Sequence, residues 1–187
     1  MGVYEEFGVR TIISVSGTST RVGGALMPPE VVDAMAEAAA DSVSMTELQA
    51  AASRYISKVT GAEAGYVTAG ASAALTLGAA AIMVGMDPAL MDQLPRTRGM
   101  RNQFIISREH RSGYDHAIRL AGARLVEVGM DEQRSGAGVR RTEAWEYEAA
   151  VTDKTAGIAY TATQDSQPPL EQVIEVARAH ELPVLVD

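Results

Sequence analysis

The chain of 187 residues contains no cysteine. Disulfide bonds, thiolate metal sites and cysteine nucleophiles are therefore excluded, and the composition fits a reducing compartment, so we expect a cytoplasmic protein. Lysine is also scarce, because Lys58 and Lys154 stand against fourteen arginines. A reaction that needs a lysine amine has only these two candidates in the chain.

An excess of positive charge is missing as well. The formal net charge is -8 and the sequence pI is about 4.9, which argues against a nucleic-acid partner. The acidic residues 1–6 give no signal-peptide pattern. The longest apolar run, residues 69–86, is rich in alanine and glycine, which favours a buried helix over a membrane span.

The chain alternates between strand-like and helix-like segments. After an irregular start with a short strand at 12–15, helices are predicted from Pro28-Pro29 onward and over 46–59, ending at Gly61. The later strands are predicted at 64–68, 103–107, 124–128, 155–160 and 183–187. Helices are predicted at 72–84, 112–121, 142–151 with Thr142 as cap, and 169–180, and loops at 86–100 and 131–138.

This alternation predicts an α/β fold with a mostly parallel sheet and helices on both faces. We interpret residues 1–27 as an N-terminal arm and residues 28–187 as one domain. A last strand that stops at Asp187, where a helix would normally follow, suggests a domain that is incomplete at its C-terminus.

Ligands of parallel sheets bind beyond the carboxyl ends of the strands. The residues there are Gly70-Ala71-Ser72, then 108–111, then 161–167, then Asp187. Gly70 permits a tight turn, and Ser72 stands where the N-cap of the following helix belongs, so a phosphate can bind the free amides. Each feature also has a plain structural interpretation: a capped turn, a surface histidine at His110, or a helix-capping aspartate.

Taken together, the segments resemble fold-type I enzymes that depend on pyridoxal phosphate. The resemblance is closest to the branch that contains the bacterial selenocysteine synthases (seryl-tRNA seleniumtransferases) and D-glucosaminate-6-phosphate ammonia-lyases. The matching segments are residues 16–24, 45–49, 60–64, 67–75, 108–111, 169–171 and 183–187, in the expected order. The resemblance implies the large domain of the aminotransferase fold, here its N-terminal part.

The resemblance also implies a role for several residues. Gly70, Ala71 and Ser72 would form the cup for the cofactor phosphate, and His110 would stack on the pyridine ring. Asp187 would pair with the pyridine nitrogen and keep it protonated. Gln164 would contact ring substituents.

Three arginines are candidates for binding a substrate carboxylate or phosphate, although surface ion pairing is the more usual role for any one of them. They are Arg21, Arg108 and Arg111.

Two positions depart from the family pattern. Ser14 stands where the family usually has asparagine. The lysine that forms the Schiff base in the family lies beyond Asp187, and neither Lys58 nor Lys154 matches it. We therefore assign no catalytic residue and no metal ligand, and expect the chain by itself to be inactive.

Three functions remain open. The first is a lyase that eliminates a group from an amino acid or amino sugar acid; the start of the chain directly at the catalytic domain and the acidic pI favour it. The second is a seleniumtransferase acting on seryl-tRNA. The third is a non-catalytic fragment or pairing module. The resemblance further implies a homo-oligomer with its active site at the subunit interface.

Overall fold

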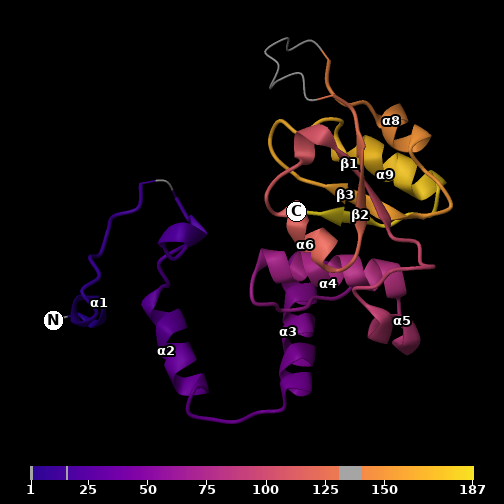
Figure 1. Ribbon diagram of the computed structural model, residues 1–187. Coiled ribbons are helices and arrows are strands. Elements are labelled where there is room, and N and C mark those ends of the chain that lie inside the picture. The colour runs from indigo at the N-terminus through magenta and orange to yellow at the C-terminus, as the bar shows by residue number, and fades with distance from the viewer. Residues whose placement is uncertain (1, 16, 131–139) are drawn as a thin grey trace. The chain divides into compact units, whose positions relative to one another are not determined.

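A computed structural model describes residues 2–15, 17–130 and 140–187 (Figure 1). The loop predicted at 131–138 lies outside these residues. The chain divides into two compact units, Met1–Gly65 and Tyr66–Asp187. The arm boundary predicted at residue 27 stays a prediction.

The first unit is helical. It contains α1 (Val3–Glu6), η1 (Thr20–Val22), α2 (Pro29–Ala38) and α3 (Met45–Thr60). Ser44 caps α3 by accepting from the Glu47 amide at 3.4 Å, and Gly61 ends it in the left-handed conformation, as predicted. The strand predicted at 12–15 is wrong, because this extended segment has no neighbouring strand in the described chain with which to form a ladder.

The second unit is built on a four-stranded sheet. The strands are β1 (Gln103–Ser107), β2 (Arg124–Val128), β3 (Thr155–Tyr160) and β4 (Val184–Val186). They are all parallel, in the order β2-β1-β3-β4, which confirms the predicted α/β fold. The strand predicted at 64–68 is wrong, because this segment joins no sheet in the described chain. It ends in a local turn, in which the Thr68 hydroxyl donates to the Gly70 carbonyl at 2.9 Å.

The helices of this unit are α4 (Ala71–Val84), α5 (Pro88–Gln93), η2 (Arg108–His110), α6 (Asp115–Leu120), α8 (Ala144–Ala149) and α9 (Leu170–Ala179). Helix α5 corrects the loop predicted at 86–100, because the Asp87 carboxylate caps the amides of Ala89 and Leu90. Thr142 is not a cap. Glu143 takes that position and forms a capping box with Glu146.

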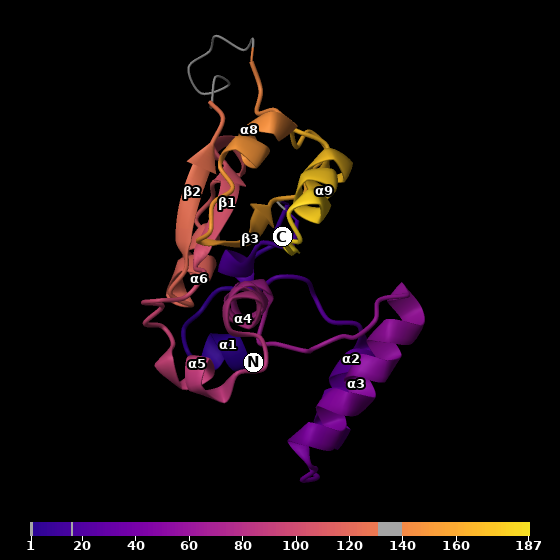
Figure 2. The ribbon, with the colours of Figure 1, turned by 90° about the vertical axis from the view of Figure 1, so that its right-hand side faces the viewer.

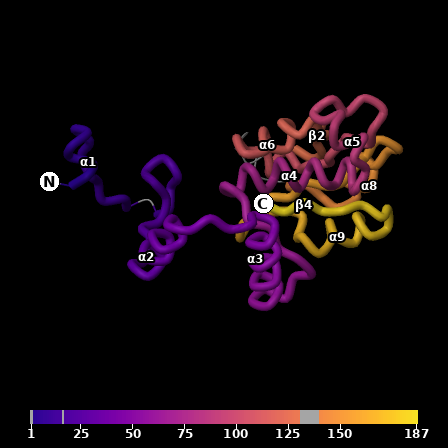
Figure 3. The backbone as a smooth tube through the Cα atoms, turned by 90° about the horizontal axis from the view of Figure 1, so that it is seen from below, coloured from indigo at the N-terminus to yellow at the C-terminus, as the bar shows by residue number. Residues whose placement is uncertain are grey.

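The helices cover both faces of the sheet. Alternate side chains of β1 point to opposite faces, so Phe104 and Ile106 pack against α4 and α6, while Ile105 packs against α8 and α9. Figure 2 shows α8 beside α9, and Figure 3 shows β4 between α4 and α9. Phe104 and Ile105 are fully buried, and burial of each such side chain contributes about 2 kcal/mol.

Within the described residues, no helix is both long enough and apolar enough to cross a bilayer. The described residues also contain no group of three or more carboxylate or histidine side chains placed to hold a metal ion.

Candidate functional site

The turn before α4 leaves several amide groups free. Gly70 is the N-cap, with φ +128, a value that L side chains rarely adopt. The first helical bond runs from the Ala74 amide to the Gly70 carbonyl, so the amides of residues 71–73 have no acceptor in the described chain. The first turn carries no acidic side chain. These features make the turn suited to binding an anion.

Ser72 lies in this turn, although one step away from its predicted place. It is the second residue of α4 and not its N-cap, because the glycine conformation at Gly70 lets the helix begin earlier. Its side chain forms no capping hydrogen bond and is exposed. The hydroxyl is therefore available to a ligand at the same helix terminus.

His110 ends η2, directly after β1. The residue is 5% exposed, and both ring nitrogens are buried without a hydrogen-bond partner among the described residues. Its ring meets Tyr160 edge to face, with the centroids 4.4 Å apart. Burial lowers the pKa of His110 below 6.5; Glu109 opposes this shift and Arg141 reinforces it. The imidazole is therefore neutral at pH 7, and its two nitrogens offer one hydrogen-bond donor and one acceptor to a ligand.

Asp187 continues the line of β4. Its amide donates to the Tyr160 carbonyl at 2.9 Å, and its carbonyl accepts from the Ala162 amide at 2.8 Å. Asp187 lines one small pocket together with His110 and with Leu75 from α4. The structure thus brings two predicted site residues, His110 and Asp187, to one pocket at the carboxyl edge of the sheet. The predicted phosphate cup, Gly70-Ala71-Ser72, does not line this pocket.

The predicted arginines have different surroundings. Arg108 and Arg111 both pair with Glu127 of β2, and Arg111 also pairs with the buried Asp115. Both charges are therefore paired within the described chain, although the Arg108 side chain is 52% exposed. Arg21 lies in η1 of the first unit and is exposed.

Gln164 lies in the loop after β3 and is exposed. It does not line the pocket that its neighbours form. An open pocket of about 320 Å³ is instead lined by Thr161, Thr163, Asp165 and Ser166, together with residues 109–112 and Arg141.

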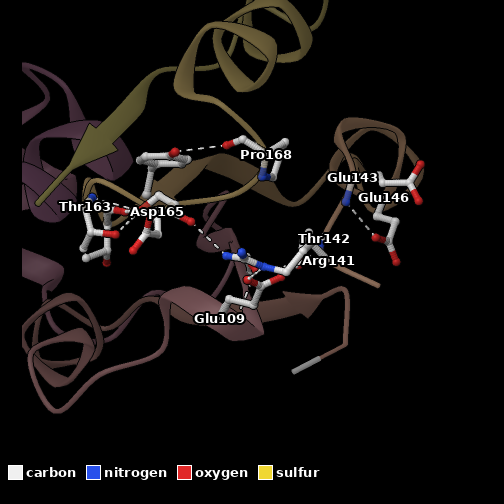
Figure 4. Close-up of polar contacts among 12 residues, drawn as sticks. Glu109, Arg141, Thr142, Glu143, Glu146, Thr163, Asp165 and Pro168 are labelled. Carbon is white, nitrogen blue, oxygen red and sulfur yellow. Dashed lines mark hydrogen bonds and ion pairs between the residues drawn. The ribbon is translucent and has the colours of Figure 1, made fainter. Parts of the chain in front are cut away.

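A polar network behind His110 was not predicted from the sequence (Figure 4). Glu109 pairs with Arg141 and accepts from the Thr142 amide at 2.8 Å. The Thr142 and Ser107 hydroxyls lie 2.7 Å apart, and the Ser107 amide donates to the Tyr147 hydroxyl at 3.1 Å. The network fixes the residue before His110 to the segment before α8.

The same network reaches the loop after β3. Arg141 donates from a terminal nitrogen to the Asp165 carbonyl at 2.9 Å. The Thr161 hydroxyl donates to the His110 carbonyl at 3.2 Å. The segment before α8 and the turn at His110 are thereby both tied to the loop after β3.

No family model matches the chain. The chain is 33% identical over 193 residues to a D-glucosaminate-6-phosphate ammonia lyase of Salmonella typhimurium, covering 99% of this chain and 50% of that protein. It is 30% identical to a 5'-C-glycyluridine monooxygenase-decarboxylase of a Streptomyces species, covering 98% of this chain and 47% of that protein. The chain spans about half the length of these curated relatives.

Solved structures agree with this similarity. A structure of D-glucosaminate-6-phosphate ammonia-lyase superimposes with a TM-score of 0.90 and 31% identity, over 100% of this chain and 51% of that one. An aspartate aminotransferase from Thermotoga maritima, 17% identical, superimposes with a TM-score of 0.57 over 98% of this chain and 48% of that one. The chain has the aminotransferase-like fold. The two curated relatives are enzymes, and their similarity to this chain extends over nearly all of it.

Proposed function

We propose that this chain supplies the cofactor-binding part of a pyridoxal-phosphate lyase that eliminates ammonia from an amino sugar acid. The observation that carries the proposal is His110, whose buried ring nitrogens have no partner in the described part of the chain and which shares a pocket with Asp187. Unpartnered buried nitrogens are costly, and a ligand that brings a polar group to either nitrogen would offset this cost. The similarity to the ammonia-lyases supports the substrate class.

The residues fit the cofactor. The free amides of residues 71–73 and the Ser72 hydroxyl would hold its phosphate, at a helix terminus that carries no acidic side chain in its first turn. His110 would lie against its ring, and Asp187 would keep the ring nitrogen protonated through its negative charge. Pyridoxal phosphate, when bound, acts as an electron sink for the carbanion that forms at the substrate's α-carbon.

The chain's own residues prepare this site. Thr161 holds the carbonyl of His110, and Glu109 ties the preceding turn to Thr142, so the ring is positioned before a ligand arrives. The neutral state of His110 avoids placing a cation against a protonated pyridine ring. Two backbone hydrogen bonds join Asp187 to Tyr160 and Ala162, and they fix the position of the backbone that carries its carboxylate.

Other parts of the proposal rest on the family resemblance. We propose that the Schiff-base lysine lies outside this chain, and that the enzyme is a homo-oligomer with an interfacial active site. Gln164, Arg21, Arg108 and Arg111 remain candidates for cofactor or substrate contacts, the last two after release from their present ion pairs. The seleniumtransferase, the non-catalytic module and the cytoplasmic location stay predictions.

The test uses the protein expressed from its complete coding sequence and saturated with pyridoxal phosphate. Incubation with D-glucosaminate 6-phosphate should release ammonia together with an oxo acid in equal amounts, and the cofactor-depleted protein should release neither. A parallel reaction supplies seryl-tRNA with a selenium donor. If the sugar acid gives no ammonia and the tRNA is modified, the lyase proposal is wrong.

A further inference from the structure

A second pocket lies at the opposite, amino edge of the sheet. It has a volume of about 370 Å³ and is lined by residues 97–102, Arg124, Asp153 and Lys154. These residues precede β1, begin β2 and precede β3, so three separate stretches of chain converge on it. None of them lines the pocket that contains His110 and Asp187.

The pocket concentrates positive charge in an acidic protein. Arg98, Arg101, Arg124 and Lys154 face a single carboxylate, Asp153, whereas the whole chain has a formal net charge of -8. All four cationic side chains are exposed, and none forms an ion pair with any residue that the structure describes. Like charges gathered in this way repel one another unless an anion lies between them.

Part of the pocket is fixed in place by hydrogen bonds. Arg101 donates from Nε to the Thr155 carbonyl at 2.6 Å, which leaves both terminal nitrogens of the guanidinium available. Asn102 donates to the Thr97 hydroxyl at 2.7 Å, and that hydroxyl donates to the Gly122 carbonyl at 2.8 Å. The loop that carries Arg98 and Arg101 is therefore anchored to the sheet and to the turn before β2.

We infer that this pocket, which we call the amino-edge pocket, is a binding site for a small phosphate-bearing anion. A guanidinium with two free nitrogens matches a phosphate in geometry, and an ammonium adds a compact charge. The pocket has the volume expected for a sugar-phosphate-sized molecule. The anion would bind away from the proposed cofactor, next to the starts of β1, β2 and β3.

The observations favour a small anion over a nucleic acid. The positive charge is confined to one pocket, whereas a nucleic acid needs a basic surface that follows its backbone. The exposed carboxylate of Asp153 within the same lining would repel a continuous phosphate chain and leaves room for one anionic group.

The test measures phosphate binding with the proposed cofactor site already filled. Inorganic phosphate is titrated by calorimetry into the complete protein saturated with pyridoxal phosphate. The double variant Arg124→Gln/Lys154→Gln should bind phosphate about tenfold more weakly than the wild type. The charge-matched control Lys58→Gln/Arg178→Gln, which changes exposed residues elsewhere, should bind within about twofold of the wild type.

Two results would overturn the inference. In the first, the wild type shows no phosphate binding, or both double variants bind as the wild type does. In the second, a short single-stranded oligonucleotide binds the wild type and displaces phosphate, while the Arg124→Gln/Lys154→Gln variant binds neither. Cofactor absorbance measured on every variant shows that the fold and the first site are intact, so failure here is separable from failure of the proposed lyase activity.

Discussion

The two edges of the sheet differ in whether their cationic side chains form ion pairs. At the carboxyl edge, the cations beside His110 are engaged: Arg108 and Arg111 pair with Glu127, and Arg141 pairs with Glu109. At the amino edge, the four cations of the amino-edge pocket pair with no described carboxylate. Paired charges hold loops in position, whereas unpaired charges attract a mobile anion. The carboxyl edge is thus built for positioning and the amino edge for electrostatic binding.

The largest effect should come from Asp187. Asp187→Asn removes the charge that would keep the cofactor nitrogen protonated, and we expect kcat to fall by about 100-fold, close to 3 kcal/mol. Steady-state ammonia release by the complete protein measures it. Asp92→Asn, an exposed position on α5 that lines neither site, is the matched control and should change kcat by less than about twofold. Equal losses in the two variants would contradict the proposed role of Asp187.

A smaller effect is expected at Gly129, where β2 ends. Its φ is +75, and an added Cβ would collide with the Thr142 hydroxyl. Gly129→Ala should lower the free energy of unfolding by about 2 kcal/mol, since it strains the backbone and displaces Thr142 from Glu109. Urea denaturation gives the value. Gly113 has open space around it, so Gly113→Ala should leave the free energy of unfolding nearly unchanged. An unchanged free energy of unfolding in Gly129→Ala would contradict the rigid placement of Thr142.

A smaller loss of stability is expected from removing the Tyr147 hydroxyl, which belongs to the same network. Tyr147→Phe leaves the buried Ser107 amide without its acceptor and should lower the free energy of unfolding by about 1–2 kcal/mol. The comparison is Tyr114→Phe, whose ring is 54% exposed and which should be neutral. Both values come from the same urea measurement. Equal stability of the two variants would mean that water replaces the lost hydroxyl.

The smallest effect is a pH dependence from His110. Because the folded-state pKa lies below 6.5, the unfolded chain binds more protons as the pH falls, so the stabilising contribution is present above pH 6.5 and is lost below it. The nearby charges are Glu109 and Arg141, which act in opposite directions. His110→Phe removes the titration.

The stability of His110→Phe relative to the wild type should therefore rise between pH 7.5 and about pH 5, measured by urea denaturation at each pH. A difference that is constant with pH, or that falls, would show that His110 is not held neutral.

Much of the second unit could be predicted because its signals are local. The apolar runs of β1 to β4, the long apolar run of α4 and the prolines before α9 are visible in the sequence, and parallel topology then brings His110 and Asp187 to one edge. The strand at 64–68 failed because a strand needs a partner, which composition does not reveal.

The network around Glu109 could not be predicted in the same way. Arg141 is 32 residues from Glu109, and the bond between them depends on the return of the chain to β1. One local signal was present: Glu143 and Glu146 form a capping box, which frees Thr142 from the capping role assigned to it. The amino-edge pocket has no local signal in the sequence, because it forms only where the residues before β1, at the start of β2 and before β3 meet in space.

One binding measurement tests the central claim that cofactor binding belongs to the carboxyl edge. Equilibrium dialysis of pyridoxal phosphate against the complete protein compares His110→Ala and Asp187→Asn with Arg124→Gln/Lys154→Gln. We predict that each carboxyl-edge variant binds the cofactor about tenfold more weakly, and that the amino-edge variant binds it as the wild type does. Weaker binding only in the amino-edge variant would contradict the account.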